Sequence, residues 1–182
     1  MKITKTNIDG LIIIEPEIFK DDRGSFLESW NVKKFKEIGI DDHFVQDNQS
    51  NSSKGILRGL HFQNPPYAQA KLVRVIRGSV LDVAVDLRSN SSTYGKHYSI
   101  VLSDKNFKSF YIPLGFAHGF VALEDNTIFS YKCSDMYNKE SEGCLLWNDQ
   151  DLGIDWNINN PIISQKDMQG LYFKDFKSKF ND

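Results

Sequence analysis

The chain has 182 residues, of which 40% are hydrophobic and 25% are charged, and its formal net charge is −2. This length is enough to bury one hydrophobic core without disulfide or metal cross-links, and we expect a single domain over residues 1–182. The near-neutral charge argues against non-specific binding to nucleic acid or to anionic membranes, because both require a basic excess.

The sequence also argues against a membrane-spanning protein and against a secreted, disulfide-linked one. No apolar run approaches the roughly 18 to 20 residues of a membrane span, and the short apolar run near the N-terminus ends at Glu15, unlike a secretory signal. The cysteines Cys133 and Cys144 lack the spacing of metal-ligand pairs and predict no disulfide framework. We therefore expect a cytoplasmic protein.

In chain order, the dominant pattern is short runs of β-branched and aromatic residues separated by turn-forming residues, which is typical of strands. Gly78 and Ser79 predict a tight turn, and helical periodicity is confined to residues 32–38 and 171–180. Many short strands, together with 23 aromatic residues, favour a sandwich or a closed barrel with bulky side chains inside. The predicted strands are residues 11–15, 25–30, 43–47, 56–63, 71–77, 80–87, 97–102, 107–112, 119–123 and 127–133.

Two polar side chains fall on apolar strand faces. Lys71 shares a face with Val73 and Val75, and burying an ammonium group without a partner is costly. Lys71 is therefore either a functional group or a lysine at a sheet edge whose stem alone is buried. Tyr131 shares a face with Phe129, and its hydroxyl either serves a site or is hydrogen-bonded within the core.

Arg58 and His61 lie in one predicted strand but have opposite parity, so a regular strand would direct them to opposite faces. Gly59 between them is a plausible site for a β-bulge, which would bring both side chains to one face. The alternative is that His61 is a structural histidine.

The segment 113–119 places a proline and two glycines around His118, and this spacing is similar to the second signature of cupin barrels. The first signature of metal-binding cupins contains two histidines separated by one residue. Here the corresponding residues are His61, Phe62 and Gln63, so the ligand pair is missing. We therefore expect neither a metal nor another cofactor.

Eight segments together resemble the dTDP-4-dehydrorhamnose 3,5-epimerase family of cupin-fold enzymes, in register over about residues 10–168. The one departure is Ala70, where the family usually has glycine beside the lysine. The resemblance implies an all-β, cupin-type jelly-roll barrel with short peripheral helices. The segments are residues 19–24, 44–48, 57–63, 68–74, 82–86, 112–120, 131–132 and 164–167.

The resemblance implies an epimerase that inverts C3 and C5 of a nucleotide-linked 4-keto-6-deoxyhexose, converting dTDP-4-dehydro-6-deoxy-D-glucose to dTDP-4-dehydro-L-rhamnose. His61 would be the base and Tyr131 the acid, because imidazole accepts protons near pH 7 and a phenol stays protonated there. Lys71 would stabilise the enolate oxygen. Asp167 would orient His61, although residues 164–167 also resemble a helix-capping box.

The family is a homodimer in which N-terminal residues reach the neighbouring site, which would place Arg23 and Glu28 in the partner's cavity. Only five arginines accompany 17 lysines, and arginine suits a diphosphate because it donates paired hydrogen bonds. The roles of Arg74, Arg77 and Arg88 stay open. The substrate-binding residues implied by the resemblance are Arg23, Glu28, Gln46, Asn48, Arg58, His118, Glu142 and Lys166, with Tyr137 a weaker candidate for stacking on the base.

Other functions remain compatible with the same residues. An enzyme that inverts only C3 or only C5, or one that acts on another nucleotide sugar such as a GDP-linked heptose, needs the same base, acid and lysine. A metal-free 3,4-ketoisomerase matches the motifs less well. A non-catalytic cupin that binds a sugar nucleotide is the alternative from another class, but it needs no acid and base in opposition.

Overall fold

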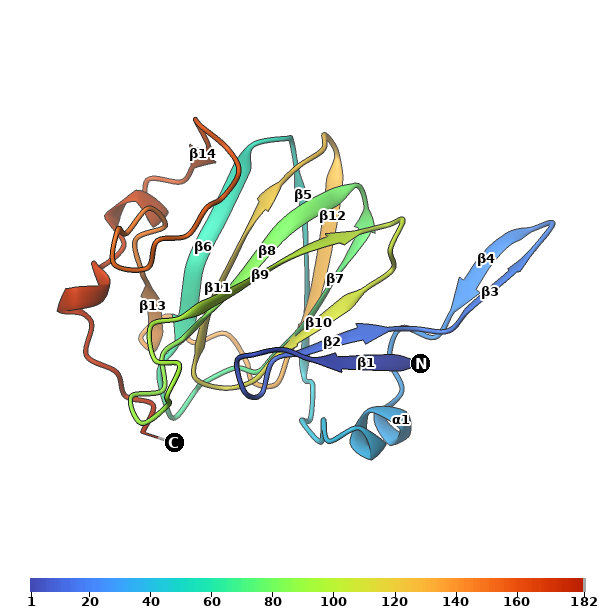
Figure 1. The fold of residues 1–182 in the computed structure, drawn as a ribbon, viewed down its shortest axis with the longest axis horizontal. Coiled ribbons are helices and arrows are strands. Elements are labelled where there is room, and N and C mark those ends of the chain that lie inside the picture. Colours follow the sequence, from blue (N-terminus) through green and yellow to red (C-terminus); the bar gives the residue numbers. More distant parts are fainter. Residues whose placement is uncertain (182) are drawn as a thin grey trace.

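The chain folds into two antiparallel sheets that face each other as a barrel, in the computed structural model, which describes residues 1–181 (Figure 1). The elements are β1 (Lys2–Lys5), β2 (Ile12–Glu15), β3 (Ile18–Asp21), β4 (Gly24–Leu27), α1 (Val32–Glu37), β5 (Gln46–Ser52), β6 (Ile56–Gln63), β7 (Lys71–Arg77), β8 (Ser79–Asp86), β9 (His97–Ser103), β10 (Ser109–Ile112), β11 (Phe116–Ala122), β12 (Thr127–Cys133), β13 (Glu142–Cys144), β14 (Ile162–Ile163) and the 3₁₀ helices η1 (Asp167–Gln169) and η2 (Phe173–Asp175). The first sheet has the order β1-β2-β10-β7-β12-β5, and the second has the order β13-β6-β11-β8-β9.

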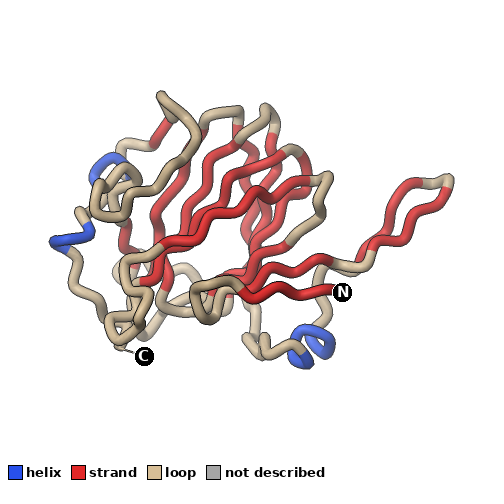
Figure 2. The backbone as a smooth tube through the Cα atoms, viewed as in Figure 1, coloured by secondary structure: helices blue, strands red, loops and turns tan. Residues whose placement is uncertain are grey.

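The expected all-β fold is confirmed, and its helices are short and peripheral (Figure 2). The helix predicted at residues 32–38 is α1, which begins after Asn31. The Asn31 side chain accepts hydrogen bonds from the N–H groups of Lys33 and Lys34. Within residues 1–181, no helix has the length and hydropathy needed to cross a bilayer.

Apolar side chains form three layers because the strands alternate between the two faces of each sheet. The central layer, which includes Val73, Phe110 and Phe129, fills the space between the sheets. The C-terminal segment covers the outer face of the second sheet, and α1 with its flanking loops covers the outer face of the first (Figure 1).

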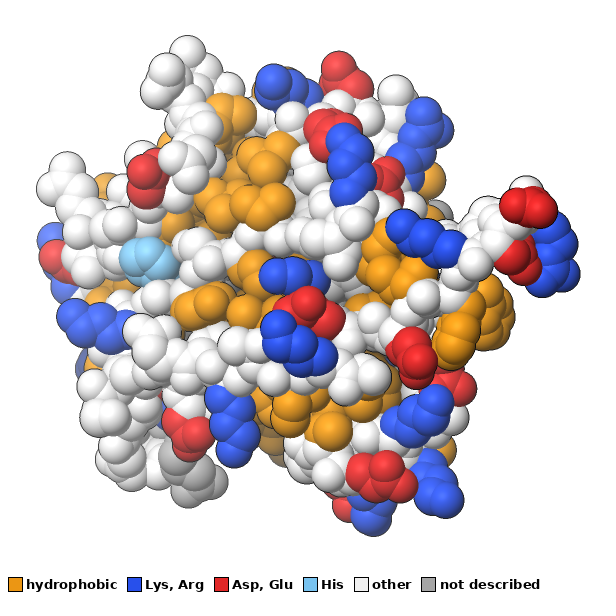
Figure 3. Space-filling view, turned by 45° about the vertical axis from the view of Figure 1, so that its right-hand side comes forward, with side chains coloured by type: hydrophobic (Ala, Val, Ile, Leu, Met, Phe, Trp, Pro, Cys, Tyr) orange, Lys and Arg blue, Asp and Glu red, His pale blue; other side chains and the backbone are white. Residues whose placement is uncertain are grey.

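The hairpin of β3 and β4 projects from the barrel as an arm (Figures 1 and 3). Phe19 and Phe26 are paired across its strands, yet they remain 55% and 69% exposed. A two-stranded hairpin is at best marginally stable in water without packing against another surface. The arm therefore presents apolar surface that the rest of its own chain does not cover.

Several predicted elements differ from the structure, and the sequence did not predict β1, β3, β13 or β14. The strand predicted at 25–30 is the shorter β4, and the strand predicted at 43–47 is β5, which begins at Gln46 and has no large apolar residue to mark it. The helix predicted at 171–180 is wrong, because only the 3₁₀ turn η2 forms there. Phe176 and Phe180 instead lie in extended backbone and pack on Phe62, with ring centres 5.2 and 6.4 Å away.

Candidate active site

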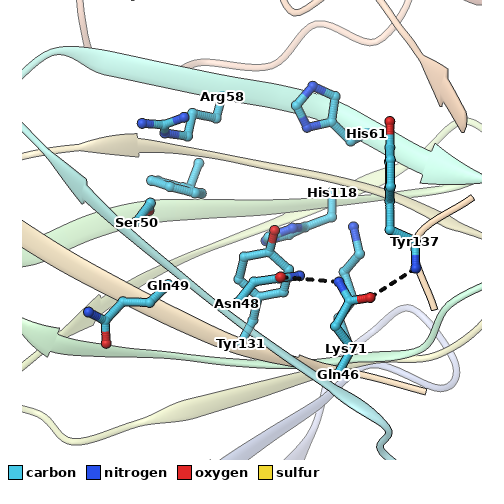
Figure 4. A pocket seen from close by; sticks show the side chains of 11 residues that line it. Gln46, Asn48, Gln49, Ser50, Arg58, His61, Lys71, His118, Tyr131 and Tyr137 are labelled. Atoms are coloured by element: carbon cyan, nitrogen blue, oxygen red, sulfur yellow. Dashed lines mark hydrogen bonds between the residues drawn. The ribbon is translucent and has the colours of Figure 1, made fainter. Parts of the chain in front are cut away.

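A polar cavity of about 500 Å³ opens between the two sheets (Figure 4). Strands β5, β7 and β12 of the first sheet form one wall, and β6 and β11 of the second sheet form the other. Seven of the predicted site residues line it: Gln46, Asn48, Arg58, His61, Lys71, His118 and Tyr131. Tyr137, the weaker candidate, also lines it, as do three residues not predicted from the sequence: Gln49, Ser50 and Phe120.

Gly59 places Arg58 and His61 on the same wall. In the register of β6 against β11, the three residue steps from Arg58 to His61 are matched by only two steps on β11, which is the bulge predicted here. Gly59 has a φ of +125°, and a Cβ there would lie 2.5 Å from the Cα of Gly119. Only glycine allows β6 and β11 to approach so closely.

His61 and Asp167 form a hydrogen bond, with 2.8 Å between Nε2 and Oδ1. Asp167 is 4% exposed, and its other oxygen accepts the N–H of Gly59. Burial alone would raise the pKa of this carboxyl. The hydrogen bonds from His61 and from the Gly59 N–H outweigh burial, so the pKa of Asp167 is lowered. An ionised Asp167 holds the proton on Nε2 and leaves Nδ1 as the basic nitrogen. The capping alternative coexists with this contact, since the N–H of Asp167 donates to the Ser164 hydroxyl.

We expect Asp167→Asn to lower kcat by about 10²-fold or more with little change in KM, because an amide stabilises the imidazolium less than a carboxylate does. Exposed Asp151 offers a matched control, and Asp151→Asn is expected to keep its activity. Steady-state kinetics and thermal melts of both variants test this. A loss of thermal stability without a loss of kcat would make Asp167 only a structural residue.

Lys71 and Tyr131 lie on the wall opposite His61, with the Lys71 Nζ 6.0 Å from the centre of the Tyr131 ring (Figure 4). Lys71 is 9% exposed and belongs to the inner face of β7, as the alternation of residues 71–77 predicts. Burial lowers the pKa of Lys71, and the negative charge of Asp82 is among the interactions that oppose the shift. Burial raises the pKa of Tyr131, so its phenol keeps its proton at neutral pH.

A second histidine–carboxylate pair lies deeper in the barrel. His118 Nε2 is 2.9 Å from the Asp82 Oδ2, and both residues are buried. Burial lowers the pKa of His118 although Asp82 opposes the shift, so its imidazole is neutral at pH 7. Asp82 was missed as a site residue. Its signal in the sequence is a carboxylate with the same parity as the apolar residues Val80 and Ala84, the anomaly that marked Lys71.

The rim of the cavity is a network of polar side chains. The Glu142 carboxylate accepts hydrogen bonds from the Tyr137 hydroxyl and from the ammonium group of Lys166. The backbone N–H of Tyr137 donates to the Gln46 side chain, which donates in turn to Asn48 (Figure 4). The rim therefore carries a cation and an aromatic ring beside the mouth.

Arg23 and Glu28 are not part of this cavity. Arg23 lies at the tip of the projecting arm, where its side chain is 90% exposed and pairs with Asp21. Glu28 pairs with Lys34 near the start of α1. Within one chain, these two predicted residues are thus separated from the others.

The structure shows the surroundings of two of the three arginines whose roles were left open. Arg88 pairs with the fully buried carboxylate of Asp86 at 2.8 Å and donates to the carbonyl of Asp9. Arg74 lies outside the cavity and lines a shallow hollow beside Asp47. Nothing in the structure explains Arg77.

Among the described residues, one group of three side chains is close enough to hold a metal ion. It consists of His61, Asp167 and Cys144, whose ligand atoms all lie within 4.8 Å of one another. Cys144 comes from β13, which flanks β6 at the edge of the second sheet.

The fold is a cupin-type barrel, and its relatives place the chain among the epimerases, which are enzymes of the isomerase class. The model of the family described as dTDP-4-dehydrorhamnose 3,5-epimerase matches residues 5–175. The chain belongs to this family.

Individual relatives are similar over nearly their whole length. A dTDP-4-dehydrorhamnose 3,5-epimerase of Methanothermobacter thermautotrophicus is 53% identical over 91% of each chain. The crystal structure of the same enzyme from Elizabethkingia anophelis is 55% identical with a TM-score of 0.92, covering 96% of this chain and 97% of that one. A dTDP-6-deoxy-D-glucose-3,5-epimerase from Legionella pneumophila in complex with dTDP-4-keto-L-rhamnose is 46% identical with a TM-score of 0.93, covering 97% and 94%.

Proposed function

We propose that the chain converts dTDP-4-dehydro-6-deoxy-D-glucose to dTDP-4-dehydro-L-rhamnose by inverting C3 and C5. The observation that carries this proposal is the placement of His61 on one wall of the cavity, with Tyr131 and Lys71 on the other. The relative that was solved with dTDP-4-keto-L-rhamnose supports the choice of substrate.

The C4 ketone makes the protons on C3 and C5 acidic. His61 takes one of these protons, and the electron pair left on carbon delocalises to O4 as an enolate. The buried ammonium group of Lys71 stabilises that oxygen. Tyr131 then gives its proton to the same carbon from the opposite face, which inverts the centre. Exchange with solvent removes the proton from His61 and returns one to Tyr131, and the same steps then occur at the second carbon.

The diphosphate of the carrier needs cations and neutral donors at the mouth. Arg58, which is exposed on β6, is suited to paired hydrogen bonds with a phosphate, and Lys166 adds a charge at the rim. Neutral His118 donates its Nε2 proton to Asp82, which leaves Nδ1 on the cavity floor as an acceptor for a hydroxyl group of the substrate. Gln46 and Asn48 bind the sugar or the base, with Glu142 holding Tyr137 at the mouth.

We further propose a homodimer in which the arm inserts Arg23, and places Glu28, at the neighbouring site. The exposed Phe19 and Phe26 would pack on the partner, which supports this arrangement. A single epimerase domain then spans residues 1–182, and each site is completed by the other chain. The proposed location is the cytoplasm, where the free thiols of Cys133 and Cys144 stay reduced.

Arg58→Ala and Arg23→Ala are each expected to raise KM about 10- to 100-fold, since a charged hydrogen bond contributes about 1.5–3 kcal/mol. If the two arginines of one site come from different chains, unfolding and refolding the two variants together produces mixed dimers with one intact site. The mixture should then recover about a quarter of the wild-type activity at low substrate concentration. Kinetics of the mixture and of each variant refolded alone measure this, and no recovery would contradict the shared site.

The proposed reaction is tested by incubating the enzyme with dTDP-4-dehydro-6-deoxy-D-glucose in D₂O and following C3 and C5 by NMR and mass spectrometry. Deuterium and inversion at both carbons are expected. Label at one carbon would identify a single-centre epimerase, and label at neither would identify a binding protein.

Because side chains perform every proton transfer in this proposal, activity is expected to survive exhaustive chelation.

A further inference from the structure

Cys144 lies beside the His61–Asp167 pair and has no part in the proposed reaction. In the pairing of β13 with β6, Cys144 is directly opposite His61. Leu60 and Leu145 exchange backbone hydrogen bonds in both directions, so residues 61 and 144 form the next, non-hydrogen-bonded pair. In such pairs the Cα atoms approach to about 4.5 Å and the side chains are closest. The strand register therefore holds the thiol against the imidazole.

The third group is fixed on the other side of the imidazole. Asp167 is buried, bonds to His61 through one carboxylate oxygen and accepts the N–H of Gly59 through the other. The three ligand atoms lie within 4.8 Å of one another. Bond lengths of about 2.0–2.3 Å to Zn²⁺ put neighbouring ligand atoms of a tetrahedral site roughly 3.2–3.8 Å apart. An ion at this site would replace the 2.8 Å hydrogen bond between His61 and Asp167, and the two ligand atoms would move apart to that spacing.

The chemistry of this set selects a particular class of ion. A nitrogen, a sulfur and an oxygen ligand suit Zn²⁺ and its softer analogue Cd²⁺, whereas Mg²⁺ and Ca²⁺ prefer sets of oxygen ligands. Three protein ligands leave a fourth position for water. His61 lines the cavity, so an ion can reach the site from the solvent-filled mouth.

We propose that His61, Asp167 and Cys144 form a binding site for a thiophilic divalent cation, and that the bound cation inhibits the enzyme. The inhibition rests on the proposed role of His61 as the base. A neutral imidazole that coordinates an ion through one nitrogen carries its proton on the other, so it cannot accept a proton from the sugar. The ion would also take the Asp167 oxygen that orients the ring.

Metal binding must displace the thiol proton of Cys144 to solvent. The positive charge of the ion favours the thiolate once the ion is bound. The site is therefore selective for ions that form strong bonds to sulfur.

The experiment titrates chelator-treated enzyme with Cd²⁺ and records both the ultraviolet charge-transfer band of the Cd–thiolate bond and the epimerase activity. We expect the band to saturate at one Cd²⁺ per chain, and the activity to fall at least tenfold as the band saturates. Cys144→Ala should keep its metal-free activity within about twofold, show no band and need at least tenfold more Cd²⁺ for half inhibition. Cys133 remains in this variant, so the missing band assigns the thiol. Millimolar Mg²⁺ should leave the wild-type activity unchanged.

Two results would overturn the proposed site: a Cd–thiolate band of wild-type intensity in Cys144→Ala, or equal inhibition of that variant and the wild type. Full activity at saturation of the wild-type band would instead leave the site in place and contradict His61 as the base. If Cys144→Ala folds poorly, Cys144→Ser keeps the side-chain size, and the same loss of the band is expected.

Discussion

His61→Ala is expected to lower both kcat and the rate of deuterium exchange at C3 and C5 about 10³-fold. General-base catalysis contributes roughly 10²- to 10⁴-fold, and one imidazole is proposed to serve both carbons. The His61 side chain is 33% exposed, so its removal costs little packing and the fold should persist. Initial rates in H₂O and proton exchange in D₂O measure the two effects.

His43 provides the matched control, because it is exposed and does not line the cavity. His43→Ala should keep the wild-type rate. Exchange at the wild-type rate at either carbon in His61→Ala would show that a second base serves that carbon, and the proposed division of roles would then fail there.

Lys71→Met is expected to lower kcat about 10²- to 10³-fold and to raise the melting temperature at the same time. Loss of one preorganised group at a developing oxyanion has an effect of that size on the rate. The stability gain arises because Lys71 is 9% exposed and burial disfavours its charged form, whereas methionine fills a similar volume without charge.

The same variant carries a pH signature. The pKa of Lys71 is lower in the folded chain than its ordinary value of 10.5. Between the folded-state pKa and pH 10.5, the unfolded chain therefore binds more protons than the folded chain. Wild-type stability therefore gains a contribution as pH rises through this window, and Lys71→Met lacks it. The advantage of the variant should be largest near pH 7 and shrink towards pH 10.5, which thermal melts at several pH values can follow.

Lys132→Met is the control, since Lys132 lies on the neighbouring strand β12, pairs with Asp47 and does not line the cavity. It should keep its activity and show no comparable gain in stability. A Lys71→Met variant that is less stable than the wild type at pH 7 would contradict the net cost in folding free energy that we assign to burying the Lys71 charge.

The sequence predicts the barrel from short runs of β-branched and aromatic residues separated by turn residues, and the alternation of a strand says which of its residues share a face. The same rule exposed Lys71 as a polar residue on an apolar face, and the structure places it on the cavity wall. Applied consistently, the rule would also have singled out Asp82, which is buried beside His118. Both anomalies are readable because the surrounding strand residues fix which face is inside.

Other features depend on contacts that one sequence does not encode locally. β5 is a polar strand whose inward side chains line a cavity, so hydrophobic alternation cannot mark it. The segment 171–180 has helical spacing, but Phe176 and Phe180 pack on Phe62 of β6 from extended backbone. The arm of β3 and β4 exposes its aromatic residues, which only the proposed partner chain would explain.

The most direct test of the proposed opposition of base and acid uses Tyr131→Phe in D₂O. His61 remains in this variant, so we expect deuterium to enter the sugar from the His61 face while the configuration is retained. The ratio of exchange to inversion should rise at least about 10²-fold over the wild type, because only the acid on the opposite wall is lost. Exchange and inversion that fall together by the same factor would contradict the assignment of base and acid to opposite walls.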